Sequence, residues 1–151
     1  MSVSAGITEQ VVPGICQSEN VARAITTSAE ARRSRNGNVP ASVFTYYGHY
    51  QISVDRIDRM EHSEAIRHGE NIAANRGANR TFYGWAVVAV ATVREAGCDA
   101  ESAPEPGNDW HAHIVMPPPA ALDNDLHDEH AGRLARRAVW QDKPSPDTNI
   151  A

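Results

Sequence analysis

The chain has 151 residues and a formal net charge of −5, and its length is typical of one domain. Hydrophobic residues make up 41% of it and 23 of them are alanine, so we expect a modest core of small side chains. No stretch approaches the ~20 apolar residues of a membrane-spanning helix. The first residues lack the basic and apolar regions of a secretory signal, which favours a cytoplasmic protein with no membrane contact.

Acidic residues are concentrated in the second half of the chain. Residues 1–80 carry nine arginines against eight acids, whereas residues 81–151 carry five basic residues against eleven acids. No Lys or Arg lies between Glu95 and Gly132, a stretch that holds nine acids. This distribution argues against a nucleic-acid-binding face there. It permits a cation or a basic protein partner, and the alternative is a solvated acidic loop.

The apolar pattern predicts a single domain with two loose ends. Residues 1–17 show no period and are expected to form a loose N-terminal arm, and residues 141–151 are expected to form a disordered tail. Between them, residues 18–140 are expected to fold as one α+β domain. Its sheet should be mostly antiparallel, with two or three helices packed on it.

Three helices are predicted from apolar residues that recur every three or four positions. The first covers residues 18–33, because Ser18 can cap it while Val21 and Ile25 share one face. The other two cover residues 63–76 and 125–140.

Extended chain is predicted over residues 42–57, 81–95 and 110–116. The second of these segments is apolar on both faces, which indicates a strand covered on both sides, with Trp85 and Val87 nearly fully buried. Residues 97–109 are rich in Pro, Gly and acids and are expected to form a surface loop.

Four histidines in the last third of the chain form the cluster that could carry chemistry. Strand alternation places His111 and His113 on one face, about 6–7 Å apart along the strand. His127 and His130 lie one turn apart at the start of the last predicted helix. Imidazole groups are preferred ligands of zinc, and an open coordination position would activate water for hydrolysis. The alternative is that these histidines only make structural hydrogen bonds.

Aromatic and basic residues provide candidate binding positions. Tyr46 and Tyr47 belong to an aromatic segment that could stack on bases, although such residues more often pack in a core or an edge strand. Arg56, with Arg59, Arg76 and Arg80, flanks the helix predicted over residues 63–76 and could form an anion pocket. The alternative is that these arginines pair on the surface with nearby acids.

A hydrolase triad can also be drawn from Ser53, Asp55 and His49. The sequence has no Gly-x-Ser-x-Gly turn, and a serine in the middle of a strand is a poor position for a nucleophile. We therefore do not favour this triad.

At QISVDRID, TFYGWAVVAV and GNDWHAHIVMP the sequence resembles a group of small uncharacterised bacterial proteins. Those proteins share an Ile-Ser-Val-Asp-Arg-like strand, a Phe-Tyr-Gly-Trp-Ala strand and a closing Asn-x-(Trp/Tyr)-His-Ala strand. The resemblance covers about residues 40–117 and carries over His111 but not His113. It implies no particular activity, cofactor or substrate.

Three functional hypotheses follow, and the last of them, nucleic-acid binding, is disfavoured by the net negative charge. The first is a non-catalytic binding or accessory protein of a bacterial multi-gene system, which acts without a cofactor on a protein partner or by self-association. The alternative is a histidine-based or metal-dependent hydrolase that acts through His111, with zinc held by His113 and by His127 or His130.

Overall fold

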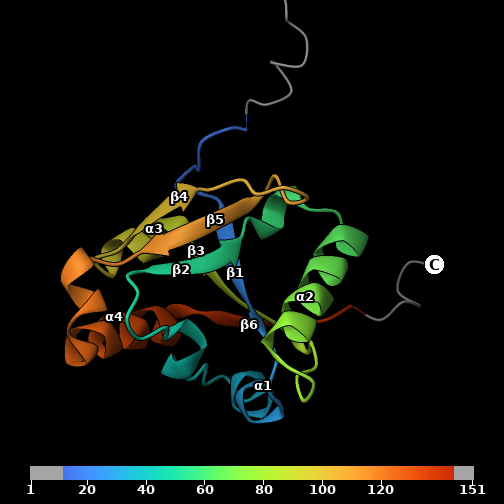
Figure 1. Ribbon diagram of the computed structural model, residues 1–151, viewed down its shortest axis with the longest axis horizontal. Helices are drawn as coiled ribbons and strands as arrows, with labels where there is room; N and C mark the ends of the chain where they lie inside the picture. The colour runs from blue at the N-terminus through green and yellow to red at the C-terminus, as the bar shows by residue number, and fades with distance from the viewer. Residues whose placement is uncertain (1–11, 145–151) are drawn as a thin grey trace, which may run out of the picture.

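Six strands form one antiparallel sheet in the computed structural model, which describes residues 12–144 (Figure 1). The strands are β1 (Asn20–Ile25), β2 (Gln51–Asp55), β3 (Gly84–Ala89), β4 (Asp99–Ser102), β5 (His111–Val115) and β6 (Val139–Asp142). They lie in the order β4-β5-β2-β1-β3-β6, and every neighbouring pair is antiparallel. The helices are α1 (Ser28–Arg35), α2 (His62–Arg76), α3 (Val90–Glu95) and α4 (Asn124–Arg137). This architecture confirms the predicted α+β fold.

The helices divide unequally between the two faces of the sheet (Figure 1). Val21 and Ile25 of β1 belong to the larger core cluster, which also contains buried residues of α1, α3 and α4. Ala22 and Ala24 point the other way, into a smaller cluster with Trp85 and with α2. Because α2 alone packs on this second face, it leaves the β2–β5 side of that face uncovered by any other helix.

The sheet has a gap beside β1. Six residue pairs join β1 to β3, but a single pair, Ala22 and Asp55, joins β1 to β2 before the two strands separate. The side chain of Arg23 lies in this gap, where its Nε donates to Val43 O (3.0 Å) and its Nη1 donates to Ser53 O (2.8 Å). The guanidinium thus satisfies carbonyl groups that have no strand partner.

The prediction of a helix over residues 18–33 is wrong in its first half. β1 occupies Asn20–Ile25, and α1 begins only at Ser28. The apolar residues of β1 fit a helical period and also a strand that is buried on both faces, so periodicity alone does not distinguish them. The cap is Thr27 instead of Ser18, and its side chain accepts from Glu30 N (3.2 Å).

Further segments differ from the prediction. The segment predicted as extended over residues 42–57 begins in a 3-10 helix, Ala41–Phe44, and its strand starts only at Gln51. The strand predicted over residues 81–95 ends at Ala89, and α3 follows with Val90 and Val93 buried on one face. β4 lies inside the segment predicted as a surface loop. The last helix ends at Arg137, and β6 then uses two residues of the predicted tail; residues 1–11 and 145–151 of the predicted arm and tail lie outside the described residues.

Trp85 is 1% exposed, as predicted, whereas Val87 is only half-buried. Val87 pairs with Val139 of the edge strand β6, and Val139 is itself 66% exposed. Among residues 12–144, no helix has both the length and the apolar character needed to cross a bilayer.

The contact of α2 with the sheet depends on Gly69. A Cβ at this position would lie 2.5 Å from ring atoms of Phe82, which is itself buried. We expect Gly69→Ala to lower the free energy of unfolding by about 1–3 kcal/mol, because overpacking outweighs the gain in helix propensity. Gly132→Ala in α4 is the matched control, since its Cβ would have no neighbour closer than 3.6 Å. Thermal melting of both variants checks this, and equal stability of the two would contradict the described packing of α2.

Candidate functional site

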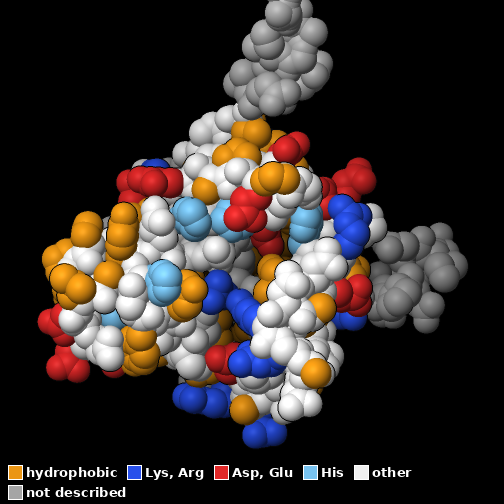
Figure 2. Space-filling model, in the orientation of Figure 1, with side chains coloured by type: hydrophobic (Ala, Val, Ile, Leu, Met, Phe, Trp, Pro, Cys, Tyr) orange, Lys and Arg blue, Asp and Glu red, His pale blue; other side chains and the backbone are white. Residues whose placement is uncertain are grey.

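A cleft of about 630 Å³ lies between α2 and the uncovered face of the sheet, and we call it the α2 cleft. Figure 2 shows it as a hollow in the surface, with histidine side chains along one edge and Lys or Arg side chains at the other. Its lining residues come from β1 (Ala22, Arg23, Ala24), the segment before β2 (Tyr46), β2 (Ser53, Val54, Asp55), α2 (His68, Asn71, Ile72, Asn75, Arg76), the loop before β5 (Glu105, Pro106, Gly107, Asn108) and β5 (His111).

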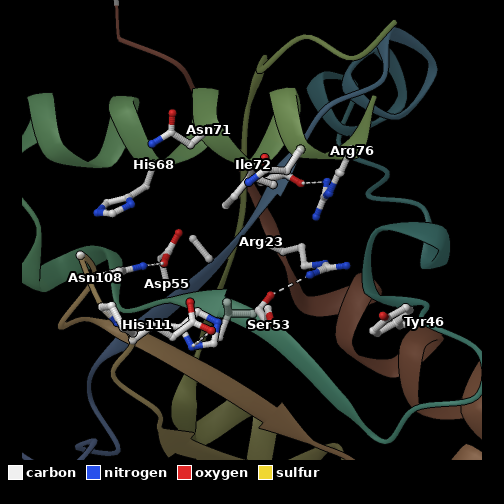
Figure 3. A pocket seen from close by; sticks show the side chains of 17 residues that line it. Arg23, Tyr46, Ser53, Asp55, His68, Asn71, Ile72, Arg76, Asn108 and His111 are labelled. Carbon is white, nitrogen blue, oxygen red and sulfur yellow. Dashed lines mark hydrogen bonds and ion pairs between the residues drawn. The ribbon is translucent and has the colours of Figure 1, made fainter. Parts of the chain in front are cut away.

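Arg23 and Arg76 form the basic end of the cleft (Figure 3). Arg76, in the last turn of α2, donates from Nη1 to Ala24 O (3.0 Å) and to Thr26 Oγ1 (3.1 Å). Within residues 12–144, neither guanidinium has a carboxylate oxygen within 4.0 Å, and the Nη2 of each has no hydrogen-bond partner. Both arginines therefore hold charge and unused donors toward the cleft.

Burial and neighbouring charges shift the pKa of both guanidinium groups. Burial, followed by the neighbouring charge of Arg76, lowers the pKa of Arg23 to about 10. Burial also lowers the pKa of Arg76. The charge of Glu30 acts in the opposite direction on both groups. Both groups remain cationic at neutral pH, so an anion bound between them would further reduce the repulsion of Arg23 by Arg76.

Asp55, His68 and His111 lie at the opposite end of the cleft (Figure 3). The sheet register places Asp55 directly across from His111 on adjacent strands. Asp55 Oδ1 accepts from Asn108 Nδ2 (2.9 Å), and His111 Nδ1 donates to Ala103 O (2.8 Å). His68 on α2 has a buried Nε2 with no hydrogen-bond partner in the described part of the chain.

Burial raises the pKa of Asp55 above its ordinary value. The hydrogen bond from Asn108 and the nearby His68 and His111 act in the opposite direction, and Glu105 adds to the rise. Asp55 is only 3% exposed and has no Lys or Arg within 4.0 Å among residues 12–144. The cleft therefore has an unpaired carboxylate at this end, about as buried as a core residue.

We expect Asp55→Asn to raise the melting temperature at neutral pH, because it removes a buried charge and keeps a similar shape. With a raised carboxyl pKa, the folded state binds more protons than the unfolded state, so wild-type stability falls as the pH rises through that pKa. The difference between variant and wild type should therefore be largest at neutral pH, shrink as the pH falls through the raised pKa, and disappear below the ordinary value of 3.8. Melting curves between acid and neutral pH measure it, and a lower melting temperature for the variant at neutral pH would contradict the described environment.

The structure brings together two of the four histidines predicted as metal ligands. The rings of His111 and His113 lie 5.1 Å apart, centroid to centroid, on the α2 face of the sheet. His127 and His130 are on α4, which packs on the other face. Among residues 12–144 no group of three or more His, Cys, Asp or Glu side chains is arranged to hold a metal ion. The geometry therefore gives no support to a zinc site built from these histidines.

His127 and His130 have contacts of their own. His127 Nε2 accepts from Tyr46 N (2.9 Å), and the ring of His127 packs against Tyr47. His130 Nδ1 lies 3.1 Å from Ala96 O and 3.9 Å from the sulfur of Cys98. Burial raises the pKa of the Cys98 thiol to about 11, which leaves it protonated and unreactive at neutral pH.

The candidate binding residues Tyr46 and Tyr47 are each about half exposed, at 49% and 50%. Tyr46 lines the α2 cleft and stacks on His49, with ring centroids 3.8 Å apart. Tyr47 turns away and donates from its hydroxyl to Asp128 Oδ1 (2.5 Å) on α4. Of the two, only Tyr46 is placed to contact a molecule in the cleft.

Arg56, the third candidate binding residue, is fully buried away from the cleft. Its donors are directed at Glu19 Oε1 and Oε2, Pro13 O, Gly14 O and Ser102 Oγ. These five contacts match the five N–H groups of a guanidinium, so no donor is left for a ligand. The expected pairing of Arg56 with nearby acids on the surface is wrong, because its partner is the buried Glu19.

The triad residues are not assembled. Ser53 is exposed on β2, His49 stacks on Tyr46, and no hydrogen bond within the described residues joins Ser53, Asp55 and His49 to one another. The prediction missed Arg23, assigned Arg76 to the wrong partners, and gave His68 no role.

Comparison with protein-family models, with curated proteins and with solved structures found no match. The functional argument therefore rests on the residues of the α2 cleft alone.

Proposed function

We propose that the protein binds a small molecule in the α2 cleft through an anionic group, either a carboxylate or a phosphate. The observation that supports this is the pair of partly buried guanidiniums, Arg23 and Arg76, which face the cleft without a carboxylate partner in the described residues. A buried charge without a partner is unfavourable, so proteins seldom keep two side by side unless something neutralises them.

The positions of the two arginines also suit this role. Each is fixed by hydrogen bonds to backbone carbonyls, Arg23 to Val43 and Ser53 and Arg76 to Ala24. These bonds orient the guanidinium planes before a ligand arrives, which lowers the entropy lost on binding. The remaining donors of each group are free for the planar, bidentate contacts that arginine makes with carboxylate and phosphate.

The test is titration of the protein with inorganic phosphate and with acetate by heteronuclear NMR. We expect saturable shifts at amides of β1, of β2 and of the C-terminal end of α2. Arg76→Ala should weaken binding roughly ten- to a hundredfold, because it removes charged hydrogen bonds.

Arg80→Ala is the matched control. Arg80 also donates to Thr26 Oγ1 (3.0 Å) but does not line the α2 cleft, so this variant should bind phosphate as the wild type does. If neither anion causes saturable shifts, or if both variants bind equally well, the proposed function is wrong.

A further inference from the structure

The two ends of the α2 cleft carry opposite charges. Arg23 and Arg76 lie at one end, and the carboxylates of Asp55 and Glu105 line the other. Within residues 12–144 neither of these carboxylates has a Lys or Arg nitrogen within 4.0 Å, and the Nδ1 of His111 lies 3.8 Å from Glu105 Oε2. The two ends form no ion pair with each other, and their opposite charges favour a ligand with opposite charges at its own two ends.

The separation between these ends follows from β2. The guanidinium of Arg23 is held beside Ser53 by its hydrogen bond to Ser53 O. Asp55 lies two residues further along the same strand. Two residues of extended chain span roughly 7 Å. A hydrogen bond at each end takes up roughly 3 Å of this span, so a ligand that contacts both ends needs its two charges a few ångströms apart.

The acidic end also offers enough acceptors for an amine. Asp55 is 97% buried and accepts only one hydrogen bond from the described residues, from Asn108. His68 contributes its buried Nε2, which has no hydrogen-bond partner there and lies 3.8 Å from Glu64 Oε2, and Glu105 adds a second carboxylate. A primary ammonium has three N–H donors and no acceptor, which matches this set.

We infer that the ligand of the α2 cleft is a small zwitterion, whose carboxylate or phosphate binds Arg23 and Arg76 and whose primary ammonium binds Asp55. This inference rests on the proposed function and adds the second charge of the ligand. Tyr46, at the rim beside Arg23, would cover the anionic end of the bound molecule (Figure 3).

The experiment compares ligands that differ only in charge. Isothermal titration is carried out with aminohexanoate, with hexanoate, which lacks the ammonium, and with hexylamine, which lacks the carboxylate. Wild-type protein should bind aminohexanoate about tenfold or more tightly than hexanoate. Along the series from glycine to aminohexanoate, affinity should peak at the chain length whose charge separation matches the two ends of the cleft.

Two variants complete the test. Asp55→Asn should reduce the preference for aminohexanoate over hexanoate to within about twofold while leaving phosphate binding intact. Asp109→Asn is the matched control, since Asp109 is exposed in the same loop and does not line the cleft. Equal binding of aminohexanoate and hexanoate by wild-type protein would overturn the zwitterion and leave the anion site standing. Loss of phosphate binding in Arg76→Ala tests that anion site separately.

Discussion

Arg56→Met should lower the free energy of unfolding by about 3–5 kcal/mol, a loss that approaches the whole stability of a marginal domain. Arg56 is 0% exposed, and its closest partner, Glu19, is 6% exposed. Their shortest contact joins Nε to Oε2 at 2.6 Å. The substitution keeps the volume of the side chain but leaves the Glu19 carboxylate buried without its cation. Denaturant unfolding followed by circular dichroism measures the effect.

The double variant Arg56→Met, Glu19→Gln separates charge from packing. It removes both ions, so it should be more stable than Arg56→Met alone. Arg59→Met is a second control, because Arg59 lies 3.8 Å from Glu19 Oε1 but is 36% exposed, and we expect a change within about 1 kcal/mol. A double variant no more stable than Arg56→Met would show that the buried pair is not the source of the loss.

The same pair predicts how stability depends on pH. Burial by itself raises the pKa of Glu19, but the hydrogen bonds from Arg56 and from the Cys16 backbone and the Arg56 charge lower it overall. A lowered carboxyl pKa means that the unfolded state binds more protons, so this contribution is present above the ordinary value of 4.5 and is lost in acid. In Arg56→Met, this acid-dependent loss should be much smaller than in the wild type.

Trp85→Ala is expected to have the second large effect, a loss of about 3–5 kcal/mol. Trp85 is 1% exposed and meets Phe82 edge-on, with ring centroids 4.7 Å apart, in the small cluster under α2. That cluster otherwise consists largely of alanine, so few neighbouring side chains can move into the cavity.

Trp140→Phe provides the contrast. Trp140 is only partly buried, and its Nε1 is a buried donor with no partner among the described residues. Removing that donor should leave stability nearly unchanged or raise it slightly. Urea unfolding of both variants distinguishes the two positions, and a loss below about 1 kcal/mol for Trp85→Ala would contradict the described core.

The sequence was informative wherever one face of an element is clearly apolar. The helix predicted over residues 63–76 differs from α2 by one residue, since its apolar stripe and its polar face are distinct. β1 was misassigned because both of its faces are apolar. β4 and β6 were missed because each is an edge strand of four residues with little or no buried side chain, so neither has a pattern to detect.

The candidate site, too, could be predicted only in part from the sequence. Strand alternation correctly placed His111 and His113 on one face, because a period of two fixes it. Arg23, Asp55 and Arg76 come from β1, β2 and α2, and only the register of the sheet brings them to one cleft. No local spacing in the sequence contains that information.

The single residue pair between β1 and β2 divides the sheet into two three-stranded halves, β4-β5-β2 and β1-β3-β6. Along this seam the side chain of Arg23 replaces part of the hydrogen-bonded backbone ladder. Separating β1 from β2 therefore breaks fewer hydrogen bonds than separating β1 from β3, which are joined by six residue pairs. Backbone amides facing the seam should exchange with deuterium faster than those in the β1–β3 ladder. Arg23 on β1 and Asp55 on β2 lie on opposite sides of this seam, so a molecule bound to both would connect the two halves of the sheet. Binding of such a molecule should therefore slow the deuterium exchange of the amides at the seam.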